Sequence, residues 1–483
     1  MKICIVAEGS YPYVTGGVSS WIHSLITSMP QHQFIIYAIG AEERNRGNFK
    51  YTMLDNVVEV KESFLDVYLR EEDCWGRSFH LSAQERQALQ LLIAGDPGTD
   101  WQKLFQLLRD QRWKTPTEFL MSHDYFDVLS ELCRERYEQL PFREMFWTVR
   151  SMLLPLMQLL REPIPEADIY HAVSTGYAGV IASFGKERYG KPMLLTEHGI
   201  YSREREEEII KADWVKGYFK DIWIQFFYGL SHCAYNCADE VITLFKRNQE
   251  IEIELGCPAD KITIIPNGVR VSDYEGLPAK GPDDPEIHIG AIVRVVPIKD
   301  IKTMLACFAL VKRELPQAVF TIMGPYDDDM EYYEECLELL KLLDAKDIHF
   351  TGSVNIKSYI GKMDVIVLTS ISEGQPLAIL EALAAGKPCV TTDVGSCREL
   401  LHGRDDSFGP AGFVAPVMNE EELAAAIISL CRNDKLRMEL GSNGKQRMSA
   451  EYTHDMFITR YDALYHSLFA KGEQPIGRHR LST

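Results

Sequence analysis

Short apolar runs alternate with amphipathic stretches along most of this chain. The runs are rich in valine, isoleucine and leucine, and most lead through a turn into apolar positions at helical spacing. They cover 2–8, 33–39, 167–172, 192–199, 238–245 and 261–269, and later 288–294, 318–325, 348–354, 364–370, 389–392 and 412–416. This repeated order of strand and helix predicts an α/β protein with buried parallel sheets.

One long segment, from about 58 to 162, breaks the alternation. It is poor in glycine, and its apolar residues recur with helical spacing at 82–93, 101–110, 125–140 and 142–160. We therefore expect a mostly helical insertion in the N-terminal domain, with its aromatic and leucine side chains in a core. The role of the insertion stays open at this point.

A polar stretch with proline and glycine at 272–285 divides the pattern in two. We predict an N-terminal domain over 1–270 and a C-terminal domain over 271–454. The last segment, 455–483, is expected to hold a helix that crosses back to the first domain and a basic tail. A chain of 483 residues is long enough for such domains to have full cores.

Composition and charge narrow the classes of function. The net charge of −19, without a basic cluster, argues against nucleic-acid binding, and an anionic substrate would need a local positive pocket. Eleven cysteines without paired spacing are typical of reduced thiols in a cytosol. Glu8 interrupts the first apolar run, which predicts a strand instead of a signal peptide, and no run of about 18 apolar residues predicts a membrane span. We expect a soluble, cytoplasmic protein.

The stretch 364–399 holds the most informative motif. A buried strand leads through a turn at 372–376 into a helix that ends near Gly386. Glu373 stands before this helix and Glu381 two turns along it, on the same side. The helix N-terminus offers backbone N–H groups and a positive dipole end, which suit a phosphate. Two carboxylates beside an anion site suit a ligand with phosphates and hydroxyls, such as a sugar nucleotide.

This Glu-x7-Glu segment, with the flanking ALAAGKPCVTTDVGSCRELL, resembles the retaining glycosyltransferases of the GT4 family. The resemblance implies the GT-B fold, in which two Rossmann-like domains face a cleft, and a UDP-sugar donor with no further cofactor. The helical insertion and the segments AEGSYPYVTGGVSSW, TEHGIYSRER and VRVVPIKDIKT are similar to the Pel exopolysaccharide branch, over nearly the whole chain. That branch implies a polysaccharide acceptor and inner-membrane synthase partners, which would place the protein at the inner face of the membrane.

Arg294 and Lys299 supply positive charge in a loop between a strand and a helix. Guanidinium is well shaped for phosphate oxygens. In the resembling family these two side chains hold the nucleotide diphosphate. The same resemblance assigns the ribose hydroxyls to Glu381, and the donor sugar to Glu373 and the backbone that follows it.

Two positions depart from the commoner motif, which has glycine where Val293 and Asp300 stand here. By analogy, the strand that ends at Val354 meets the nucleotide base. The full set expected at the donor is Arg294, Lys299, Gly324, Val354, Glu373, Gly374, Gln375, Pro376, Leu377 and Glu381.

A second candidate site lies in the N-terminal domain. Gly16 and Gly17 form a glycine loop after the first strand, without the G-x-G-x-x-G spacing of dinucleotide sites. His198 follows another strand, at the end where α/β folds bind ligands. The resemblance places both features at the cleft and the transfer centre. The catalytic residues that we predict are His198, Glu373, Arg294 and Lys299.

Two further features are interpreted as structural. His171 stands at the strand end next to that of His198 and is expected to be a hydrogen-bonded core histidine. The acidic run at 326–329 is similar to a metal-binding Asp-x-Asp, but it follows a strand and precedes a helix. Carboxylates of a helix N-terminus are therefore expected there, and no essential metal is predicted.

The sequence thus predicts a retaining glycosyltransferase that transfers a hexose or N-acetylhexosamine from a UDP-sugar to a growing polysaccharide. Two other functions stay open: a UDP-N-acetylhexosamine 2-epimerase of the same fold, which needs no acceptor, and a non-catalytic subunit that binds nucleotide sugars in a membrane complex. No residue chooses among glucose, N-acetylglucosamine and N-acetylgalactosamine. Acceptor, processivity and oligomeric state are likewise undetermined.

Overall fold

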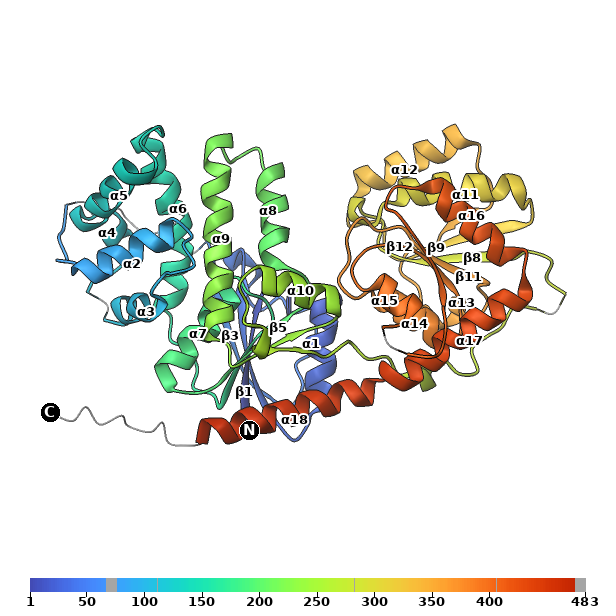
Figure 1. The fold of residues 1–483 in the computed structure, drawn as a ribbon, viewed down its shortest axis with the longest axis horizontal. Helices are drawn as coiled ribbons and strands as arrows, with labels where there is room; N and C mark the ends of the chain where they lie inside the picture. The colour runs from blue at the N-terminus through green and yellow to red at the C-terminus, as the bar shows by residue number, and fades with distance from the viewer. Residues whose placement is uncertain (67–75, 111, 282, 405, 474–483) are drawn as a thin grey trace. The chain divides into compact units, whose positions relative to one another are not determined.

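The computed structural model describes residues 1–66, 76–110, 112–281, 283–404 and 406–473 (Figure 1). By their internal contacts these residues form two units. The N-terminal unit holds 1–243, 249–264 and the chain from Tyr461 onward, and the C-terminal unit holds 244–248 and 265–460. The functional division into 1–270, 271–454 and 455–483 stays a prediction, and most of the predicted tail, 474–483, lies outside the described residues.

The N-terminal unit is built on a parallel sheet in the order β3-β2-β1-β4-β5-β6-β7. Side chains on both faces of its central strands are buried: on β1, Ile3 and Ile5 face one side and Cys4 and Val6 the other, and all four are fully buried. Runs that are apolar without alternation therefore form parallel strands, as predicted. The strands are β1 (Lys2–Glu8), β2 (Gln33–Gly40), β3 (Val57–Phe64), β4 (Ile169–Ala172), β5 (Met193–Glu197), β6 (Glu240–Thr243) and β7 (Ile262–Ile264).

The helical insertion begins later than the predicted position 58. Residues Val57–Phe64 form the edge strand β3, which pairs in parallel with β2. An edge strand tolerates polar positions, and these positions are why the sequence pattern assigns the stretch to the helical insertion. The inserted helices share one apolar core with the sheet, as expected, and lie beside α9 in Figure 1. They are α2 (Ala83–Ile93), α3 (Trp101–Arg109), α4 (Pro116–Leu120), α5 (His123–Arg136) and α6 (Phe142–Arg161).

The remaining connections of the N-terminal sheet are helices that follow its strands. They are α1 (Gly17–Ser28), α7 (Tyr177–Tyr189), α8 (Tyr201–Lys211), α9 (Gly217–Cys237) and α10 (Lys246–Glu254).

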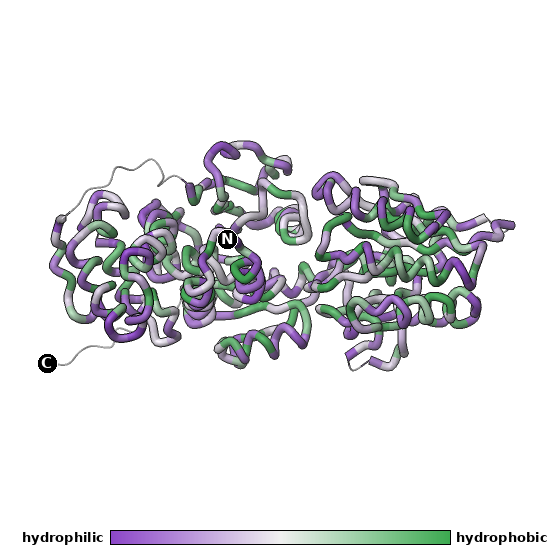
Figure 2. The backbone as a smooth tube through the Cα atoms, turned by 90° about the horizontal axis from the view of Figure 1, so that it is seen from above, coloured by the Kyte–Doolittle hydropathy of each residue, from purple (hydrophilic) through white to green (hydrophobic). Residues whose placement is uncertain are grey.

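The C-terminal unit has a parallel sheet in the order β10-β9-β8-β11-β12-β13. Its strands are β8 (Ile287–Ile292), β9 (Ala318–Met323), β10 (Ile348–Phe350), β11 (Val365–Leu368), β12 (Cys389–Thr392) and β13 (Gly412–Ala415). In Figure 2 the apolar stretches of this unit run mainly through its interior, and the polar ones lie mainly in outer helices and loops. The helices are α11 (Ile301–Glu314), α12 (Met330–Leu343), α13 (Lys357–Ile360), α14 (Leu377–Ala384), α15 (Cys397–His402), α16 (Glu420–Cys431) and α17 (Asp434–Glu451).

Both sheets have the strand order of a Rossmann fold. In each, the first strand lies between the second and the fourth, so the chain reverses its direction of winding there. Ligands of such sheets bind outside the carboxyl ends of the strands at this switch point. In the N-terminal unit the point lies between β1 and β4, and in the C-terminal unit between β8 and β11.

The last helix, α18 (His454–Glu473), belongs to the N-terminal unit from Tyr461 onward. The Tyr465 hydroxyl lies 2.7 Å from His171 Nδ1, and Thr196 Oγ1 lies 2.8 Å from His171 Nε2. His171 is fully buried with both ring nitrogens in use, so its expected structural role is confirmed. Within the described ranges, no helix combines the length and the apolarity that a membrane span needs.

Candidate functional site

The loop after β8 and the turn after β11 meet at the switch point of the C-terminal sheet. The two strands pair in parallel, which brings their carboxyl ends together. The Ile371 N–H donates to the Ile298 carbonyl at 2.9 Å, and Thr369 Oγ1 donates to the Lys299 carbonyl at 3.0 Å. These bonds fix the predicted phosphate-binding loop against the turn that carries Glu373.

Lys299 and Glu373 form an ion pair at this junction. Lys299 Nζ lies 2.5 Å from Glu373 Oε1, and Ser370 Oγ donates to the same oxygen at 2.6 Å. The lysine and glutamate side chains are 19% and 10% exposed, so salt screens the pair less than it would on an open surface. A phosphate at this point would compete with Glu373 for the ammonium group. The structure thus brings together two of the predicted catalytic residues.

Arg294 lies in the same loop but contacts another acid. Its Nη1 atom is 3.3 Å from Asp328 Oδ2, and the side chains are 53% and 42% exposed. An exposed pair of this kind contributes only about 0–1 kcal/mol, so an anionic ligand can replace Asp328 at little cost. The neighbouring Asp329 caps α12, because its carboxylate accepts the Tyr332 N–H at 3.0 Å. The helix-terminal role expected for the acidic run is confirmed at Asp329.

Asp300 gives a physical reason for one departure from the commoner motif. Its φ angle is 45°, in the left-handed region that favours glycine and that aspartate enters more readily than most residues. The Asp300 carboxylate then caps α11 by accepting the Thr303 N–H at 3.3 Å. Aspartate therefore replaces glycine here and also satisfies a donor at the start of the helix.

Gly324 packs against the loop that carries Arg294. It has a φ of 146°, and a Cβ atom there would lie 2.0 Å from the Val293 carbonyl oxygen. Its N–H donates to the Gly352 carbonyl at 3.0 Å. The apolar run predicted a strand that ends at Val354, but Val354 lies beyond the end of β10 (Ile348–Phe350). The chain bends before it, at Gly352, which has a φ of 68°.

The turn after Glu373 is held by close backbone packing. A Cβ atom on Gly395, which has a φ of 52°, would lie 2.1 Å from the Gly374 carbonyl oxygen. Gln375 is buried, and its Oε1 atom accepts the Asn267 N–H at 2.6 Å. The Gln375 side chain therefore positions the turn, which leaves backbone groups of the turn for a ligand.

Glu381 lies on α14, which starts at Leu377 after the N-cap residue Pro376. Burial raises the pKa of Glu381, and a hydrogen bond with Tyr274 and the charge of Lys357 partly oppose this rise. Sequence reasoning missed both neighbours. Tyr274 falls in the predicted linker and Lys357 in a short helix without a motif, so only their contacts with Glu381 reveal them.

In the N-terminal unit, Gly16 and Gly17 open α1 beyond the carboxyl end of β1. Both are exposed, and a Cβ atom on either would meet nothing within 4 Å. The fold itself therefore does not require glycine at these positions. Two residues without side chains leave the first-turn N–H groups of α1 open to a ligand.

His198 follows β5, and its ring meets Trp21 edge-on with the centroids 4.6 Å apart. Burial lowers the pKa of His198 to about 4, which makes the imidazole neutral at pH 7. Its Nε2 atom is buried and has no hydrogen-bond partner among the described residues. A neutral histidine with one unused nitrogen can position a hydroxyl, but it does not serve as a cationic acid at neutral pH.

Comparison with known families divides the chain in two. Residues 1–260, more than half of the 483, match the model described as Domain of unknown function (DUF3492). The chain belongs to the DUF3492 family. Residues 277–447 match the model described as Glycosyl transferases group 1, and this range includes every predicted donor residue from Arg294 to Glu381.

Curated relatives are similar to part of this DUF3492 chain. It is 29% identical over 272 residues to the UDP-Gal:alpha-D-GlcNAc-diphosphoundecaprenol alpha-1,3-galactosyltransferase of Escherichia coli. This alignment covers 53% of the chain and 65% of that enzyme. The chain is 26% identical over 249 residues to the N,N'-diacetylbacillosaminyl-diphospho-undecaprenol alpha-1,3-N-acetylgalactosaminyltransferase of Campylobacter jejuni, over 49% of the chain and 62% of that enzyme. The chain thus spans less than two thirds of either relative.

Solved structures resemble nearly the whole chain. The Anabaena protein Alr3699/HepE in complex with UDP matches with a TM-score of 0.62 and 14% identity, over 97% of the DUF3492 chain and all of that protein. The sucrose-phosphate synthase of Thermosynechococcus elongatus matches with a TM-score of 0.61 and 14% identity, over 97% and 99%. At this identity the likeness concerns the fold alone. It confirms the predicted GT-B class, with two Rossmann-like domains.

Two buried carboxyl groups lie next to the N-terminal candidate site of this DUF3492 protein. Burial raises the pKa of Glu197 to about 7 and that of Glu252 to about 9, and the charge of Glu197 adds to the rise at Glu252. Because these values exceed the ordinary 4.5, the folded state holds more protons than the unfolded state between pH 4.5 and 9. Stability of the N-terminal unit should therefore fall as pH rises through this range.

We expect Glu252→Gln to remove much of this pH dependence. For each proton that the folded state alone retains, the free energy of unfolding falls by about 1.4 kcal/mol per pH unit. Urea unfolding of wild type and variant between pH 6 and 9 measures the slope. The exposed Glu250 on the same helix provides the control Glu250→Gln, which should keep the wild-type slope. Equal slopes in all three proteins would contradict the assignment.

Proposed function

We propose that the protein is a retaining glycosyltransferase. It would transfer a hexose or N-acetylhexosamine from a UDP-sugar to a growing polysaccharide, as in Pel-type exopolysaccharide synthesis. The observation that carries the proposal is the contact of Lys299 with Glu373 in the turn before α14, with Glu381 on the helix that follows. The match of this region to Glycosyl transferases group 1 supports it, as do relatives whose names describe sugar transfer.

In the proposed donor complex, the diphosphate lies between the loop after β8 and the N-terminus of α14. Lys299 leaves Glu373 and binds a phosphate oxygen, and Arg294 leaves Asp328 and binds another phosphate oxygen. With Lys299 bound to the phosphate, the Glu373 carboxylate can accept hydrogen bonds from the donor sugar hydroxyls. Two cationic side chains and a helix N-terminus offset the phosphate charge, so no metal ion is part of the proposal.

Glu381 is proposed to bind the ribose of the nucleotide. Its pKa is raised by burial, so hydroxyl groups that donate to the carboxylate would stabilise the charged form. When no nucleotide is bound, the Tyr274 hydroxyl donates such a hydrogen bond to Glu381, and ribose hydroxyls would join or replace it. Gly324 and Val354 would border the nucleotide, and Gly324 packs against the loop after β8.

His198 and Gly17 are proposed to act on the acceptor side. The neutral imidazole would orient the acceptor or a donor hydroxyl through its unused Nε2 atom, and the glycine loop would let the substrate approach the backbone.

As the bond to the diphosphate breaks, charge grows on the phosphate oxygens. Arg294 and Lys299 should therefore stabilise the transition state more than the bound donor.

We further propose that inner-membrane partners recruit the protein from the cytoplasm to its acceptor.

Calorimetric binding of UDP, without added metal, tests the donor site. We expect wild type to bind UDP and Glu381→Ala to bind at least about tenfold more weakly, because the ribose would lose a charge-assisted hydrogen bond worth about 1.5–3 kcal/mol. Glu335→Ala is a matched control, since this glutamate is 50% exposed and pairs only with Lys302 in the described contacts. Binding of another nucleoside diphosphate in place of UDP would overturn the proposed donor.

Release of UDP from a UDP-sugar with and without acceptor then separates transfer from the alternatives. A glycosyltransferase releases UDP at a rate that acceptor oligosaccharide increases. A 2-epimerase would convert the sugar without any acceptor, and a binding subunit would hold UDP without turnover even when a polysaccharide-synthesising membrane fraction is added.

A further inference from the structure

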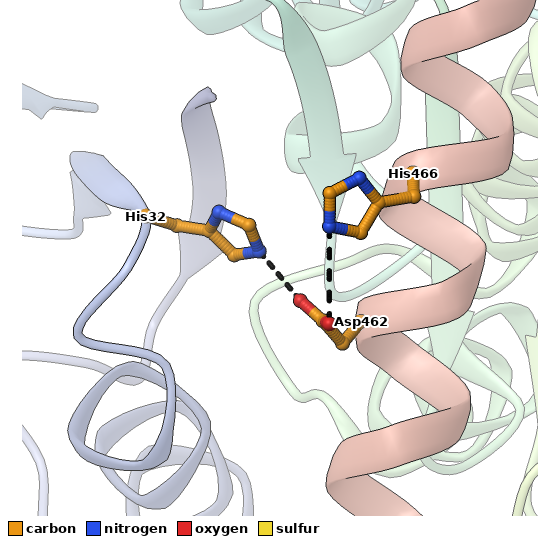
Figure 3. A group of neighbouring side chains, drawn as sticks. All are labelled: His32, Asp462 and His466. Atoms are coloured by element: carbon orange, nitrogen blue, oxygen red, sulfur yellow. Dashed lines mark hydrogen bonds and ion pairs between the residues drawn. The ribbon is translucent and has the colours of Figure 1, made fainter.

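Three side chains with metal-binding chemistry gather where the last helix meets the N-terminal unit. They are His32, Asp462 and His466, and Figure 3 shows their rings and carboxylate turned toward one another. One ligand atom from each lies within 4.8 Å of the other two. No residue of the candidate site described above belongs to this group.

The fold holds these side chains from two directions. Asp462 and His466 are one helical turn apart on α18 and so lie on the same face. His32 stands in the turn between α1 and β2, where its N–H donates to the Met29 carbonyl at 3.1 Å. Between the two ligands on α18, the Tyr465 hydroxyl bonds to His171 in the core, which fixes the register of the helix. The group is therefore placed by buried structure on both sides.

The contacts within the group leave one side open. His32 Nε2 lies 2.7 Å from Asp462 Oδ1, and Gln31 Nε2 donates to the same oxygen at 3.1 Å. The other oxygen, Oδ2, is 3.9 Å from His466 Nε2, which is too long for a hydrogen bond. His32 is 3% exposed, while Asp462 and His466 are 32% and 63% exposed. A small ion can therefore enter from the His466 side.

Two imidazole nitrogens and one carboxylate are a donor set that suits zinc. Zinc binds such ligands at about 2.0–2.2 Å in tetrahedral geometry, which places neighbouring donor atoms about 3.3 Å apart. His32 Nε2 lies 2.7 Å from Asp462 Oδ1 and His466 Nε2 lies 3.9 Å from Asp462 Oδ2, distances on either side of this value, so side-chain rotations would bring both nitrogens to zinc-binding distance around the carboxylate. The exposure of His466 leaves room for water as the fourth ligand.

We propose that His32, Asp462 and His466 bind one zinc ion, which fastens α18 to the N-terminal unit. Zinc would replace the proton shared by His32 and Asp462 and draw in His466. The ion would tie together residues about 430 positions apart in sequence, as the hydrogen bond between His32 and Asp462 does in its absence. This site is independent of the proposed transfer reaction.

A second group, Asp284, Glu286 and His288, provides an internal comparison. Its ligand atoms are also within 4.8 Å of one another, but it offers a single nitrogen, and all three residues come from one short stretch of the C-terminal unit. An acidic cluster of this kind is common on surfaces without a metal. It carries no proposal here and supplies the control variant.

Equilibrium dialysis against zinc chloride tests the site, with full-length protein purified without a metal-affinity tag and stripped with a chelator. We expect one zinc per chain, and His466→Ala should bind at least about tenfold more weakly because it removes one of three ligands. The exposed His466 makes the 3.9 Å contact with Asp462 and an edge-on ring contact with His32, neither of which holds the helix, so this variant should keep the far-ultraviolet circular dichroism of wild type. Zinc should also raise the melting temperature of wild type and not that of His466→Ala.

A second variant tests whether zinc binding needs the negative charge of Asp462. Asp462→Asn retains an oxygen that can accept from His32 but removes the negative charge, and it should also weaken zinc binding. Glu286→Gln should bind zinc as wild type does. The proposal is overturned if wild type takes up no zinc, if His466→Ala keeps wild-type affinity, or if Glu286→Gln abolishes binding.

Discussion

Replacement of Lys299 by alanine is expected to lower the turnover number by about 10²–10³-fold, with a much smaller change in UDP affinity. The reason is that negative charge grows on the diphosphate as the sugar leaves, so the ammonium group stabilises the transition state more than the bound donor. In the free protein the same ammonium contacts Glu373, which places it at the junction of the two loops before substrate arrives.

The measurement is the initial rate of UDP release at saturating UDP-sugar, together with calorimetric binding of UDP. Lys302→Ala is the matched control, because Lys302 lies three positions along the chain, on α11, where it pairs with Glu335 at 2.8 Å. The control should retain wild-type turnover. Arg294→Ala should behave as Lys299→Ala does. A loss of affinity with intact turnover in either site variant would contradict the assignment to the leaving group.

Replacement of Gly324 by alanine should destabilise the C-terminal unit by about 3 kcal/mol and also impair UDP binding. The new Cβ would lie 2.0 Å from the Val293 carbonyl oxygen, a backbone atom that cannot rotate away, and φ would remain at 146°. Relief requires the loop with Arg294 to move. The hydrogen bond from Val295 N–H to the Pro325 carbonyl, 2.9 Å long, would then be strained or lost.

Hydrogen exchange of amides in β8 and β9 measures the stability of this unit apart from the N-terminal one. The matched control is Gly281→Ala in the same unit, where a Cβ atom would meet only Asp284 Cβ at 3.9 Å, an ordinary contact. Wild-type protection in Gly324→Ala would show that the loop yields easily. In that case the close packing at Gly324 would not be what positions Arg294.

Much of the fold could be predicted because parallel strands leave a strong local signal. Buried on both faces, β1 and β11 are continuous apolar runs, and the helix after β11 carries its own start in the turn at 372–376. For the edge strand β3 the sequence predicts part of the helical insertion instead. Its side chains are only partly buried, so its sequence lacks the apolar run that marks the inner strands. The apolar run also predicts that Val354 ends a strand, because the turn at Gly352 depends on backbone geometry that apolar periodicity does not record.

The candidate site was predictable in its parts and not in its contacts. Glu373, Glu381, Arg294 and Lys299 stand in recognisable local motifs, but the choice of Lys299, and not Arg294, as the partner of Glu373 comes from the packing of two loops 74 positions apart. Tyr274 had no local signal at all. Its role depends on a contact with Glu381 across the C-terminal unit.

The sequence by itself determined the α/β class with two Rossmann-like domains, and it predicted the residues with the chemistry for a sugar nucleotide, because strand and helix periodicity and short motifs are local properties of the chain. Only the tertiary structure decided which of these residues touch. It paired Lys299 with Glu373, buried Glu197 beside Glu252, and brought His32 to Asp462 across 430 positions. Contacts between distant segments depend on how sheets and helices pack, and that packing is set by the whole core and not by any single stretch of sequence.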